Sequence, residues 1–232
     1  QVMGLHAHVG SQVFASTVFY DTADIMLRFL AELKEKLGWE AEMLNLGGGY
    51  GVRYTEQDPT VDIGYELSTV GRHIKEGCAR LGLAEPMVLM EPGRSIVADA
   101  GMTLYTVQST KRIPGYRSYV AIDGGMTDNP RYALYRSAYT VYLANKMDAP
   151  RDFVCTVGGR CCESGDMIQE HVALPVPERG DILAVCTTGA YNYSMASNYN
   201  SIPRPPIVMV DGERDYVAVR RETFEDLAAR EV

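Results

Sequence analysis

Three short apolar runs occur in the first hundred residues, at 2–9, 43–46 and 87–90. Each run has the length of a buried strand. Two segments with the four-residue spacing of a helix separate them. The order strand, helix, strand, helix, strand, with a repeat of about 40 residues, predicts a βαβ series with a parallel sheet.

Both predicted helices are amphipathic. The first begins at about Thr22, stops at Gly38 and has apolar residues four apart: Ile25, Phe29, Leu33 and Leu37. The second ends at Gly82 and carries its apolar residues on one side: Leu67, Val70, Ile74, Cys78 and Leu81. A glycine after the last apolar position is a common helix stop signal.

After about Ser95 the pattern changes to short β-rich runs punctuated by Gly, Pro and Asp. The runs lie at 104–108, 116–122, 153–157, 182–186, 207–210 and 216–219. They predict an antiparallel β-barrel or sandwich domain, closed by a short helix over about 222–230. The fold class is therefore α/β plus all-β, with one domain over 1–98 and a second over 99–232.

Three strands with two helices are too few to close a (β/α)8 barrel, which usually needs about 250 residues. Either the first half is a small open α/β layer, or it is part of a barrel whose remainder is missing. We favour the second interpretation, also because the chain does not begin with methionine. A truncated barrel leaves sheet edges and apolar helix faces open, so stable folding alone would require dimerisation or rearranged packing.

Composition argues against several classes of function. No apolar run approaches the roughly 20 residues of a membrane-spanning helix, and the first residues lack the pattern of a signal peptide. The net charge of −8 argues against a general nucleic-acid binder, which needs a surplus of Lys and Arg. The five cysteines have no paired metal-binding spacing and indicate free thiols, so we expect a cytoplasmic protein.

Polar and glycine residues follow each predicted strand of the first half. His8 and Ser11 follow the first strand, Gly47–Gly49 the second and Glu91–Arg94 the third. In parallel α/β folds, ligands bind at this edge of the sheet. A triple glycine exposes backbone N–H groups to an anion, and Arg and Ser side chains can add contacts. The pattern predicts a phosphate site, although a glycine run alone can also be only a tight turn.

The histidines have two readings. A histidine on an apolar strand is more often a hydrogen-bonded core residue than a functional one. His6 and His8 would lie on the same strand face, so metal ligation is conceivable. However, no nearby carboxylate or cysteine completes a zinc site. A flat ring stacked on a flat cofactor explains His8 better.

Three segments, in this order, resemble the fold-type III decarboxylases that use pyridoxal 5'-phosphate (PLP). They are GLHAHVGSQ at 4–12, NLGGG at 45–49 and EPGR at 91–94. The resemblance implies the C-terminal part of an alanine-racemase-like (β/α)8 barrel, with PLP as cofactor. The implied cofactor-binding residues are His8, Ser11, Gly48, Gly49, Glu91, Gly93, Arg94 and, from the second half, Tyr191.

The resemblance also implies how these residues contact PLP. His8 would stack on the pyridine ring and count among the catalytic residues. The phosphate would be held mainly by Ser11, Gly49, Gly93 and Arg94. Glu91 would pair with the pyridine nitrogen, which keeps that nitrogen protonated and the ring a strong electron sink.

Three segments of the second half are similar to diaminopimelate decarboxylases, a branch of this family. They are DGGMTDNPRYALY at 123–135, CCESGD at 161–166 and GAYNYSM at 189–195. Where the family typically has Arg-Pro-x-Leu-Tyr, this chain has Tyr132 in place of Pro. The resemblance runs across essentially the whole chain. It implies decarboxylation of the amino acid meso-2,6-diaminopimelate to L-lysine and CO2, at active sites shared in a homodimer.

The implied substrate-binding residues are Arg94, Arg131, Tyr135, Glu163 and Tyr191. Diaminopimelate carries a second amino-carboxylate far from the reacting centre. Arg131 can pair with that carboxylate in a fork, Tyr135 can add a hydroxyl, and Glu163 can meet the distal ammonium.

Cys162 is implied as the general acid that returns a proton after carbon dioxide leaves. Each of these assignments has a plainer alternative. Cys162 could be a buried structural thiol, the usual fate of a free cysteine. Arg131 could form a surface ion pair, and Tyr191 could pack in the core.

A PLP enzyme of this type binds its cofactor covalently through a lysine amine. In the family that lysine precedes the first of the matching segments. The lysines of this chain are Lys34, Lys36, Lys75, Lys111 and Lys146, and none is predicted on a strand that opens onto the ligand edge. We therefore expect a fragment of an active enzyme that cannot catalyse decarboxylation by itself.

Two alternatives remain open. The parent enzyme could decarboxylate another basic amino acid or a polyamine precursor on the same fold. Arg131 and Tyr135 argue against ornithine, whose far end is only an amine. The other alternative is a catalytically dead regulatory homologue, which the presence of His8, Glu91 and Cys162 makes less attractive for the parent protein.

Overall fold

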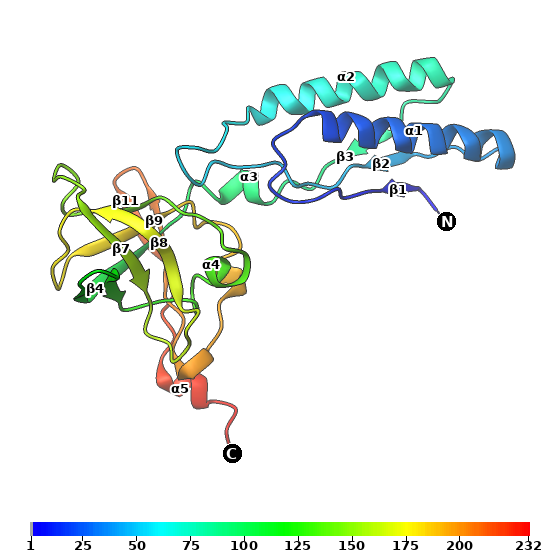
Figure 1. Ribbon diagram of the computed structural model, residues 1–232. Helices are drawn as coiled ribbons and strands as arrows, with labels where there is room; N and C mark the ends of the chain where they lie inside the picture. Colours follow the sequence, from blue (N-terminus) through cyan, green and yellow to red (C-terminus); the bar gives the residue numbers. More distant parts are fainter. Residues whose placement is uncertain (1) are drawn as a thin grey trace. The chain divides into compact units, whose positions relative to one another are not determined.

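The computed structural model describes residues 2–232 and divides into two compact units, Gln1–Asp99 and Ala100–Val232 (Figure 1). In the first unit, strands β1 (Gly4–His6), β2 (Met43–Asn45) and β3 (Met87–Leu89) form a parallel sheet in the order β1-β2-β3. The predicted βαβ series is therefore confirmed. The first strand is shorter than the predicted 2–9, because residues from Ala7 onward leave the ladder to form the ligand edge.

Helices α1 (Thr17–Leu37) and α2 (Ile63–Leu81) connect the strands, and the four-residue helix α3 (Arg94–Val97) follows β3. Both long helices end at the predicted glycines, Gly38 and Gly82, which adopt the left-handed conformation that a side chain disfavours. The start of α1 is five residues earlier than predicted, since no strong N-cap residue marks it: the Ser16 side chain makes no capping bond.

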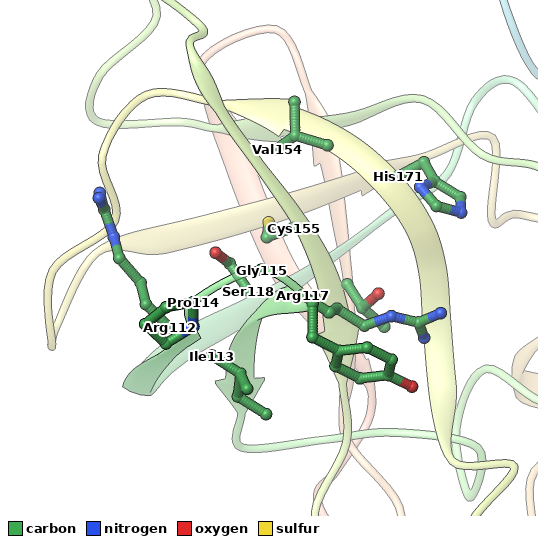
Figure 2. A pocket seen from close by; sticks show the side chains of 11 residues that line it. Arg112, Ile113, Pro114, Gly115, Arg117, Ser118, Val154, Cys155 and His171 are labelled. Carbon is green, nitrogen blue, oxygen red and sulfur yellow. The ribbon is translucent and has the colours of Figure 1, made fainter.

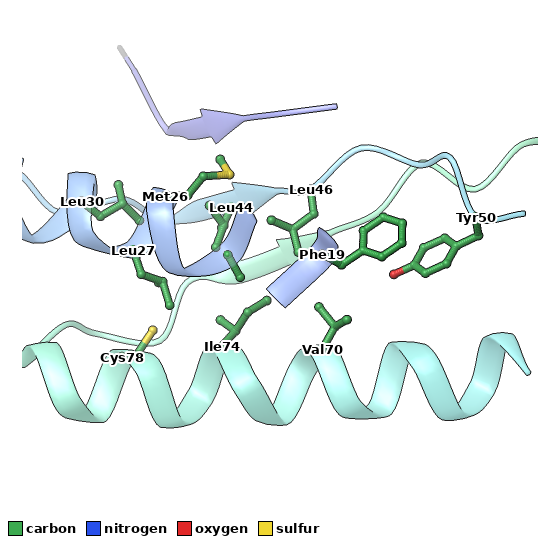
Figure 3. Packing of buried hydrophobic residues seen from close by; sticks show 11 residues of the cluster. Phe19, Met26, Leu27, Leu30, Leu44, Leu46, Tyr50, Val70, Ile74 and Cys78 are labelled. Atoms are coloured by element: carbon green, nitrogen blue, oxygen red, sulfur yellow. The ribbon is translucent and has the colours of Figure 1, made fainter. Parts of the chain in front are cut away.

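The core of the first unit lies between the two helices and the sheet, as Figure 3 shows. Its buried members include Leu27 and Leu30 of α1, Leu44 of β2 and Ile74 of α2. A Cβ on Gly77 of α2 would lie 2.6 Å from Leu27 Cδ1, so a glycine there lets the helices approach closely.

The apolar residues that recur four apart in the sequence of α1 do not form its buried side. Ile25, Phe29 and Leu37 are 66%, 47% and 71% exposed. The helix has a second apolar stripe, and it is this one that packs on the sheet: Phe19, Ala23, Met26, Leu27 and Leu30. Spacing alone could not distinguish the two, because both recur at helical intervals. In α2 the predicted Val70, Ile74 and Cys78 are buried, whereas Leu67 and Leu81 lie at the exposed margin.

The second unit contains a six-stranded sheet and a separate two-stranded one. The larger sheet has the order β6-β9-β4-β5-β7-β8: β6 (Val141–Leu143), β9 (Ile182–Cys186), β4 (Met102–Ile113), β5 (Arg117–Ile122), β7 (Phe153–Gly158) and β8 (Met167–Leu174). Its ladders are antiparallel except between β5 and β7, which pair in parallel. The smaller sheet is the antiparallel hairpin of β10 (Ile207–Asp211) and β11 (Arg214–Val219).

All six predicted strands of this unit exist, but two further strands were missed. β6 has only three residues. β8 carries the polar run Gln169, Glu170 and His171, where His171 has a positive φ of 55° that breaks the alternation of a regular strand. The final helix, α5 (Phe224–Ala228), is shorter than predicted and starts with a capping box between Thr223 and Asp226.

Among the described residues, no helix is long and apolar enough to cross a membrane. Within the same residues, no group of three or more His, Cys, Asp or Glu side chains is arranged to hold a metal ion.

Candidate functional site

In the first unit, backbone hydrogen bonds tie together the three segments that follow the strands. Val13 N donates to Gly49 O at 2.9 Å, Gly51 N donates to Val13 O at 2.9 Å, and Glu91 N donates to Gly47 O at 2.7 Å. The predicted residues His8, Ser11, Gly48, Gly49, Glu91, Gly93 and Arg94 lie on these segments. We call the structure formed by residues 8–11, 47–49 and 91–94 the strand-end cup.

The cup requires glycine at positions 48 and 49, because backbone atoms of neighbouring segments lie very close to them. A Cβ on Gly48 would lie 2.1 Å from Glu91 O, and one on Gly49 would lie 2.0 Å from Gly10 O. Gly49 also has a φ of +99°, which L side chains rarely adopt. The turn is therefore tight, and side chains larger than glycine would force its backbone away from the neighbouring segments.

His8 is exposed and lies against the glycine turn. Its Nδ1 accepts a hydrogen bond from Gly48 N at 3.2 Å. In a neutral imidazole this bond leaves the proton on Nε2. A Cβ on Gly49 would be 3.4 Å from His8 Cε1, so the ring edge borders the turn. The interpretation of His8 as a hydrogen-bonded core residue is wrong, because the side chain is exposed.

Glu91 is held by Asn45, a residue without a role in the sequence-based prediction. Asn45 Nδ2 donates to Glu91 Oε1 at 2.9 Å, and Asn45 Oδ1 accepts from Gly47 N at 2.8 Å. His6 Nε2 lies 3.6 Å from Glu91 Oε2. Asn45 thus fixes the carboxylate relative to the glycine turn. The residue stood inside the NLGGG segment, and only the structure assigns it a contact.

Arg94 is the buried cation of the cup, with 7% of its surface exposed. Its Nη2 donates to Ser11 Oγ at 2.9 Å, and its Nη1 donates to the hydroxyl of Tyr54. Tyr54, which is 5% exposed, was also missed, because it lies five residues beyond the glycine run in a loop without a pattern.

The cup fits a phosphorylated pyridine in its donor chemistry. It combines an arginine and a serine hydroxyl, a glycine turn that a Cβ would obstruct, an exposed imidazole and a carboxylate. An oxyanion suits the first three groups, a flat ring suits the fourth, and a protonated ring nitrogen suits the fifth.

In the second unit, two of the predicted residues lie beside the guanidinium of a third. Arg131 is 6% exposed and lies on the short helix α4 (Arg131–Tyr135). Its Cζ is 5.6 Å from the ring centroid of Tyr135 and 5.9 Å from that of Tyr191. Both tyrosines are largely exposed, at 61% and 42%. The alternatives of a surface ion pair for Arg131 and core packing for Tyr191 are therefore wrong.

A buried amide pair connects the segments that carry these residues. Asn192 Nδ2 donates to Asn129 Oδ1 at 2.6 Å, and the two side chains are 2% and 0% exposed. Asn129 lies two residues before Arg131, and Asn192 directly follows Tyr191, whose φ is +63°. Buried hydrogen bonds of this kind fix the spacing of the groups beside them.

Tyr132, which replaces the proline typical of the family, is buried on the other side of α4. Its hydroxyl donates to Glu170 Oε2 at 2.6 Å, and Arg117 Nη1 lies 2.8 Å from Glu170 Oε1. The Tyr132 hydrogen bond, followed by the Arg117 contact, lowers the pKa of Glu170 below its usual 4.5. The substitution therefore adds a polar anchor for the helix that carries Arg131.

The loop with Cys162 and Glu163 is organised by Asp166. The Asp166 carboxylate accepts from Met126 N and from Cys161 N, each at 2.6 Å. Cys162 is exposed, so it is no buried structural thiol. Glu163 is also exposed, and its Oε1 accepts from Ser164 Oγ and Gly165 N at 3.2 Å.

The two adjacent cysteines differ in their environment. Burial, with the charge and hydrogen bond of Asp166, raises the pKa of the Cys161 thiol to about 11. Cys161 is therefore protonated and poorly reactive near neutral pH. Cys162 faces solvent instead and is the one of the pair that can meet a substrate.

Four of the five lysines contact acidic side chains away from the cup. Lys34 lies 2.6 Å from Glu40, Lys36 lies 3.2 Å from Glu32, and Lys75 lies 3.9 Å from Glu85. Lys146 lies 2.8 Å from Asp181 and 2.9 Å from Glu178. Lys111 is on the long strand β4 of the second unit.

A pocket of about 560 Å³ lies beside the turn between β4 and β5 (Figure 2). It is lined by Arg112, Arg117, Cys155 and His171, among others, and by none of the predicted site residues. Its rim is exposed, and Arg117 already pairs with Glu170.

Residues 1–98 match the family model described as the pyridoxal-binding domain of pyridoxal-dependent decarboxylases. This match implies PLP as the cofactor. The chain is 45% identical over 227 residues to a diaminopimelate decarboxylase of Bacillus subtilis, covering 98% of this chain and 52% of the relative.

Solved structures of decarboxylases share the fold. A diaminopimelate decarboxylase from M. jannaschii, in co-complex with L-lysine, superposes with a TM-score of 0.89 at 33% identity, covering 100% of this chain and 52% of the other. A lysine/ornithine decarboxylase from Vibrio vulnificus, complexed with cadaverine, gives a TM-score of 0.74 at 26% identity over 88% of this chain and 53% of the other. The chain thus spans about half the length of the relatives that it matches.

Proposed function

Because the chain is homologous to diaminopimelate decarboxylases along its whole length, we propose that it supplies roughly the downstream half of such an enzyme. The complete protein would release CO2 from meso-2,6-diaminopimelate and produce L-lysine. The upstream half would supply the remaining barrel elements and the lysine that binds the cofactor. Residues 1–98 would then be the end of the barrel, and residues 99–232 a β-barrel or sandwich domain.

The cofactor would be held by the strand-end cup. Arg94, Ser11 and the backbone of Gly49 and Gly93 would bind its phosphate. Gly48, whose N–H donates to His8, would border the cofactor, and Glu91, held by Asn45, would face the ring nitrogen. When bound, PLP supplies the electron sink for the electrons that remain after CO2 leaves. His8, fixed through Nδ1 by Gly48, would present its flat face to the ring.

The substrate would be recognised through its distal amino-carboxylate. Arg131 would pair with the carboxylate, and Tyr135 would contribute a hydroxyl. Glu163 would accept a hydrogen bond from the distal ammonium, and Tyr191 would line the same space. We propose that Arg94 also contacts the substrate, and that Cys162 donates a proton from its thiol at the decarboxylated carbon.

In this proposal the complete enzyme is a homodimer in which the Cys162–Glu163 loop enters the site of the other subunit. The exposure of both side chains supports the proposal, because a second subunit can reach them. The mass of the complete protein in solution, with mixed dimers that carry different inactivating substitutions, tests it: restored activity in the mixture is expected if each site uses both chains.

One observation carries the choice of substrate: Arg131 is buried beneath two exposed tyrosines. A guanidinium suits a ligand that ends in a carboxylate, because its planar donors can pair with both carboxylate oxygens in a fork. Ornithine and lysine end in an ammonium instead. The second candidate, decarboxylation of lysine or ornithine, is favoured only by the likeness to the Vibrio vulnificus structure.

The test is a fusion of this chain behind the part of the Bacillus subtilis relative that precedes the matched region. The purified fusion is loaded with PLP and offered meso-diaminopimelate, lysine, ornithine and arginine in parallel. We expect equimolar CO2 and lysine from diaminopimelate and at least about a hundredfold lower kcat/KM for the others. Faster release of CO2 from ornithine or lysine would support the second candidate instead.

A further inference from the structure

We propose that Tyr54 is a positioning residue, which holds the Arg94 guanidinium in the strand-end cup and thereby sets the affinity of the cup for a phosphate monoester. The inference rests on the proposed function, because it takes the cofactor phosphate as the ligand of Arg94. It adds a residue outside the three strand-end segments and assigns it a measurable effect.

The contacts of Arg94 carry the proposal. The two outer nitrogens of the guanidinium are held separately, Nη2 by Ser11 Oγ at 2.9 Å and Nη1 by the Tyr54 hydroxyl. The Tyr54 ring lies beside the cation, with Cζ 5.6 Å from its centroid. Both of these oxygen partners are hydroxyl groups. A guanidinium held at both outer nitrogens has a fixed orientation toward an incoming oxyanion.

Tyr54 can act as an anchor because its own loop is fixed. Tyr54 N and Thr55 N both donate to Asp58 Oδ2, at 3.0 and 2.8 Å. Just before it, the Gln12 side chain bonds both backbone groups of Val52, at 3.0 and 2.9 Å. Gln12 directly follows Ser11, so the loop is tied to the segment that carries the second partner of Arg94.

A fixed guanidinium binds an anion better than a mobile one. An arginine side chain loses conformational entropy when it is immobilised, and here that entropy is already lost on folding rather than on ligand binding. Without the Tyr54 hydroxyl, the Arg94 side chain would lose part of its conformational entropy only when the ligand binds. A hydrogen bond to a charged group would also be lost. Such bonds contribute enough to change an affinity about tenfold.

The oxyanion could come from the cofactor phosphate or from a substrate carboxylate. We choose the phosphate, because Arg94 shares the cup with the Ser11 hydroxyl and with the glycine turn. A hydroxyl and a glycine backbone are groups that commonly bind phosphate. The second unit offers its own buried arginine, Arg131, for a carboxylate.

The test uses the 232-residue chain, labelled for NMR, with the Tyr54→Phe variant and the matched control Tyr65→Phe. Tyr65 lies in the same unit but is 64% exposed on α2. Each protein is titrated with inorganic phosphate, PLP, pyridoxal without phosphate, and L-lysine. The resonances to follow are the Arg94 Nε–H and the backbone amides of Gly48 and Gly49.

We expect Tyr54→Phe to weaken binding of phosphate and PLP about tenfold, to leave any affinity for pyridoxal unchanged, and to broaden the Arg94 Nε–H resonance without ligand. Tyr65→Phe should match the wild type. If the wild type binds phosphate and Tyr54→Phe equals Tyr65→Phe in affinity and in the Arg94 resonance, the role of Tyr54 is overturned while the cofactor site stands.

Two other results would also count against the inference. If no protein binds phosphate or PLP, the proposed cofactor site of this chain fails and the inference fails with it. If L-lysine, but not phosphate, perturbs Arg94 and does so less in Tyr54→Phe, the anion is a substrate carboxylate and the choice of phosphate is wrong.

Discussion

The two units hold their candidate ligand residues by different means. In the first unit, backbone bonds between Val13 and Gly49 and between Gly47 and Glu91, together with glycines that tolerate near contact, shape the strand-end cup. In the second, side-chain pairs fix the groups around Arg131, above all Asn129 with Asn192 and Tyr132 with Glu170. The first kind of site depends on close backbone packing, and the second on the pairing of particular side chains.

The two units are alike in that each buries an apolar core and leaves other apolar side chains exposed. In the first unit, Leu27 is fully buried, whereas Leu37 of the same helix is 71% exposed. In the second unit, Leu183 of the larger sheet is fully buried, whereas Leu104 of β4 is 58% exposed.

The largest effect is expected from Leu27→Ala in the first unit. Leu27 is fully buried between the helices, so the change removes apolar contacts and leaves a cavity, at a cost of about 3 kcal/mol. Leu37→Ala on the same helix should cost less than about 0.5 kcal/mol, because Leu37 is 71% exposed. Hydrogen exchange of first-unit amides measures both. Equal effects would contradict the assignment of Leu27 to the buried stripe and of Leu37 to the exposed one.

A second pair of variants tests the glycine turn. Gly48→Ala would place a Cβ 2.1 Å from the backbone oxygen of Glu91, so the strands must separate at a cost of about 2 kcal/mol or more. At Gly71 in α2 nothing lies within 4 Å, and Gly71→Ala should stabilise the helix by roughly 0.5–1 kcal/mol. Urea unfolding gives both values. A neutral Gly48→Ala would show that the turn can open without loss.

In the second unit, Asn192→Ala should cost about 2 kcal/mol, because it leaves a buried Asn129 carbonyl oxygen without this donor. The double-mutant cycle with Asn129→Ala separates the pair from its surroundings. We expect the double variant to be clearly less destabilised than the sum of the single ones. Additive values would contradict a direct coupling between the two amides.

The smallest effect concerns pH. Tyr132 and Arg117 lower the pKa of Glu170, so the folded state favours its carboxylate. That contribution to stability is present above the usual pKa of 4.5 and is lost as the pH falls through the lower folded value. Glu170→Gln should cost about 1 kcal/mol at pH 7 and lose less stability on acidification. Urea midpoints between pH 3 and 7 that run parallel in the two proteins would refute this.

The contrast between the units also explains which features the sequence could predict. The βαβ order and the cup residues His8, Ser11, Gly48 and Arg94 are local patterns, and the structure brings them together. Tyr54, which contacts Arg94 across 40 positions, has no such pattern.

Other features depended on tertiary contacts in the same way. The outward stripe of α1 and the buried one have the same spacing, and only the position of the sheet decides between them. Asn129 and Asn192 are 63 positions apart, and neither carries a signal that it pairs with the other. The sequence shows that Tyr132 replaces the proline typical of the family. It does not show that Tyr132 pairs with Glu170, which lies on β8, a strand that was not predicted.

The most direct test of the account compares Arg131→Leu with Arg136→Leu in the PLP-loaded fusion enzyme described above. Arg136 is a matched control at the end of the same helix, with a 65% exposed side chain. We predict that Arg131→Leu lowers kcat/KM for meso-diaminopimelate at least about a hundredfold, while Arg136→Leu stays within about threefold of the unsubstituted enzyme. Equal activity of the two variants would contradict the assignment of Arg131 to the distal carboxylate, and with it the proposed substrate.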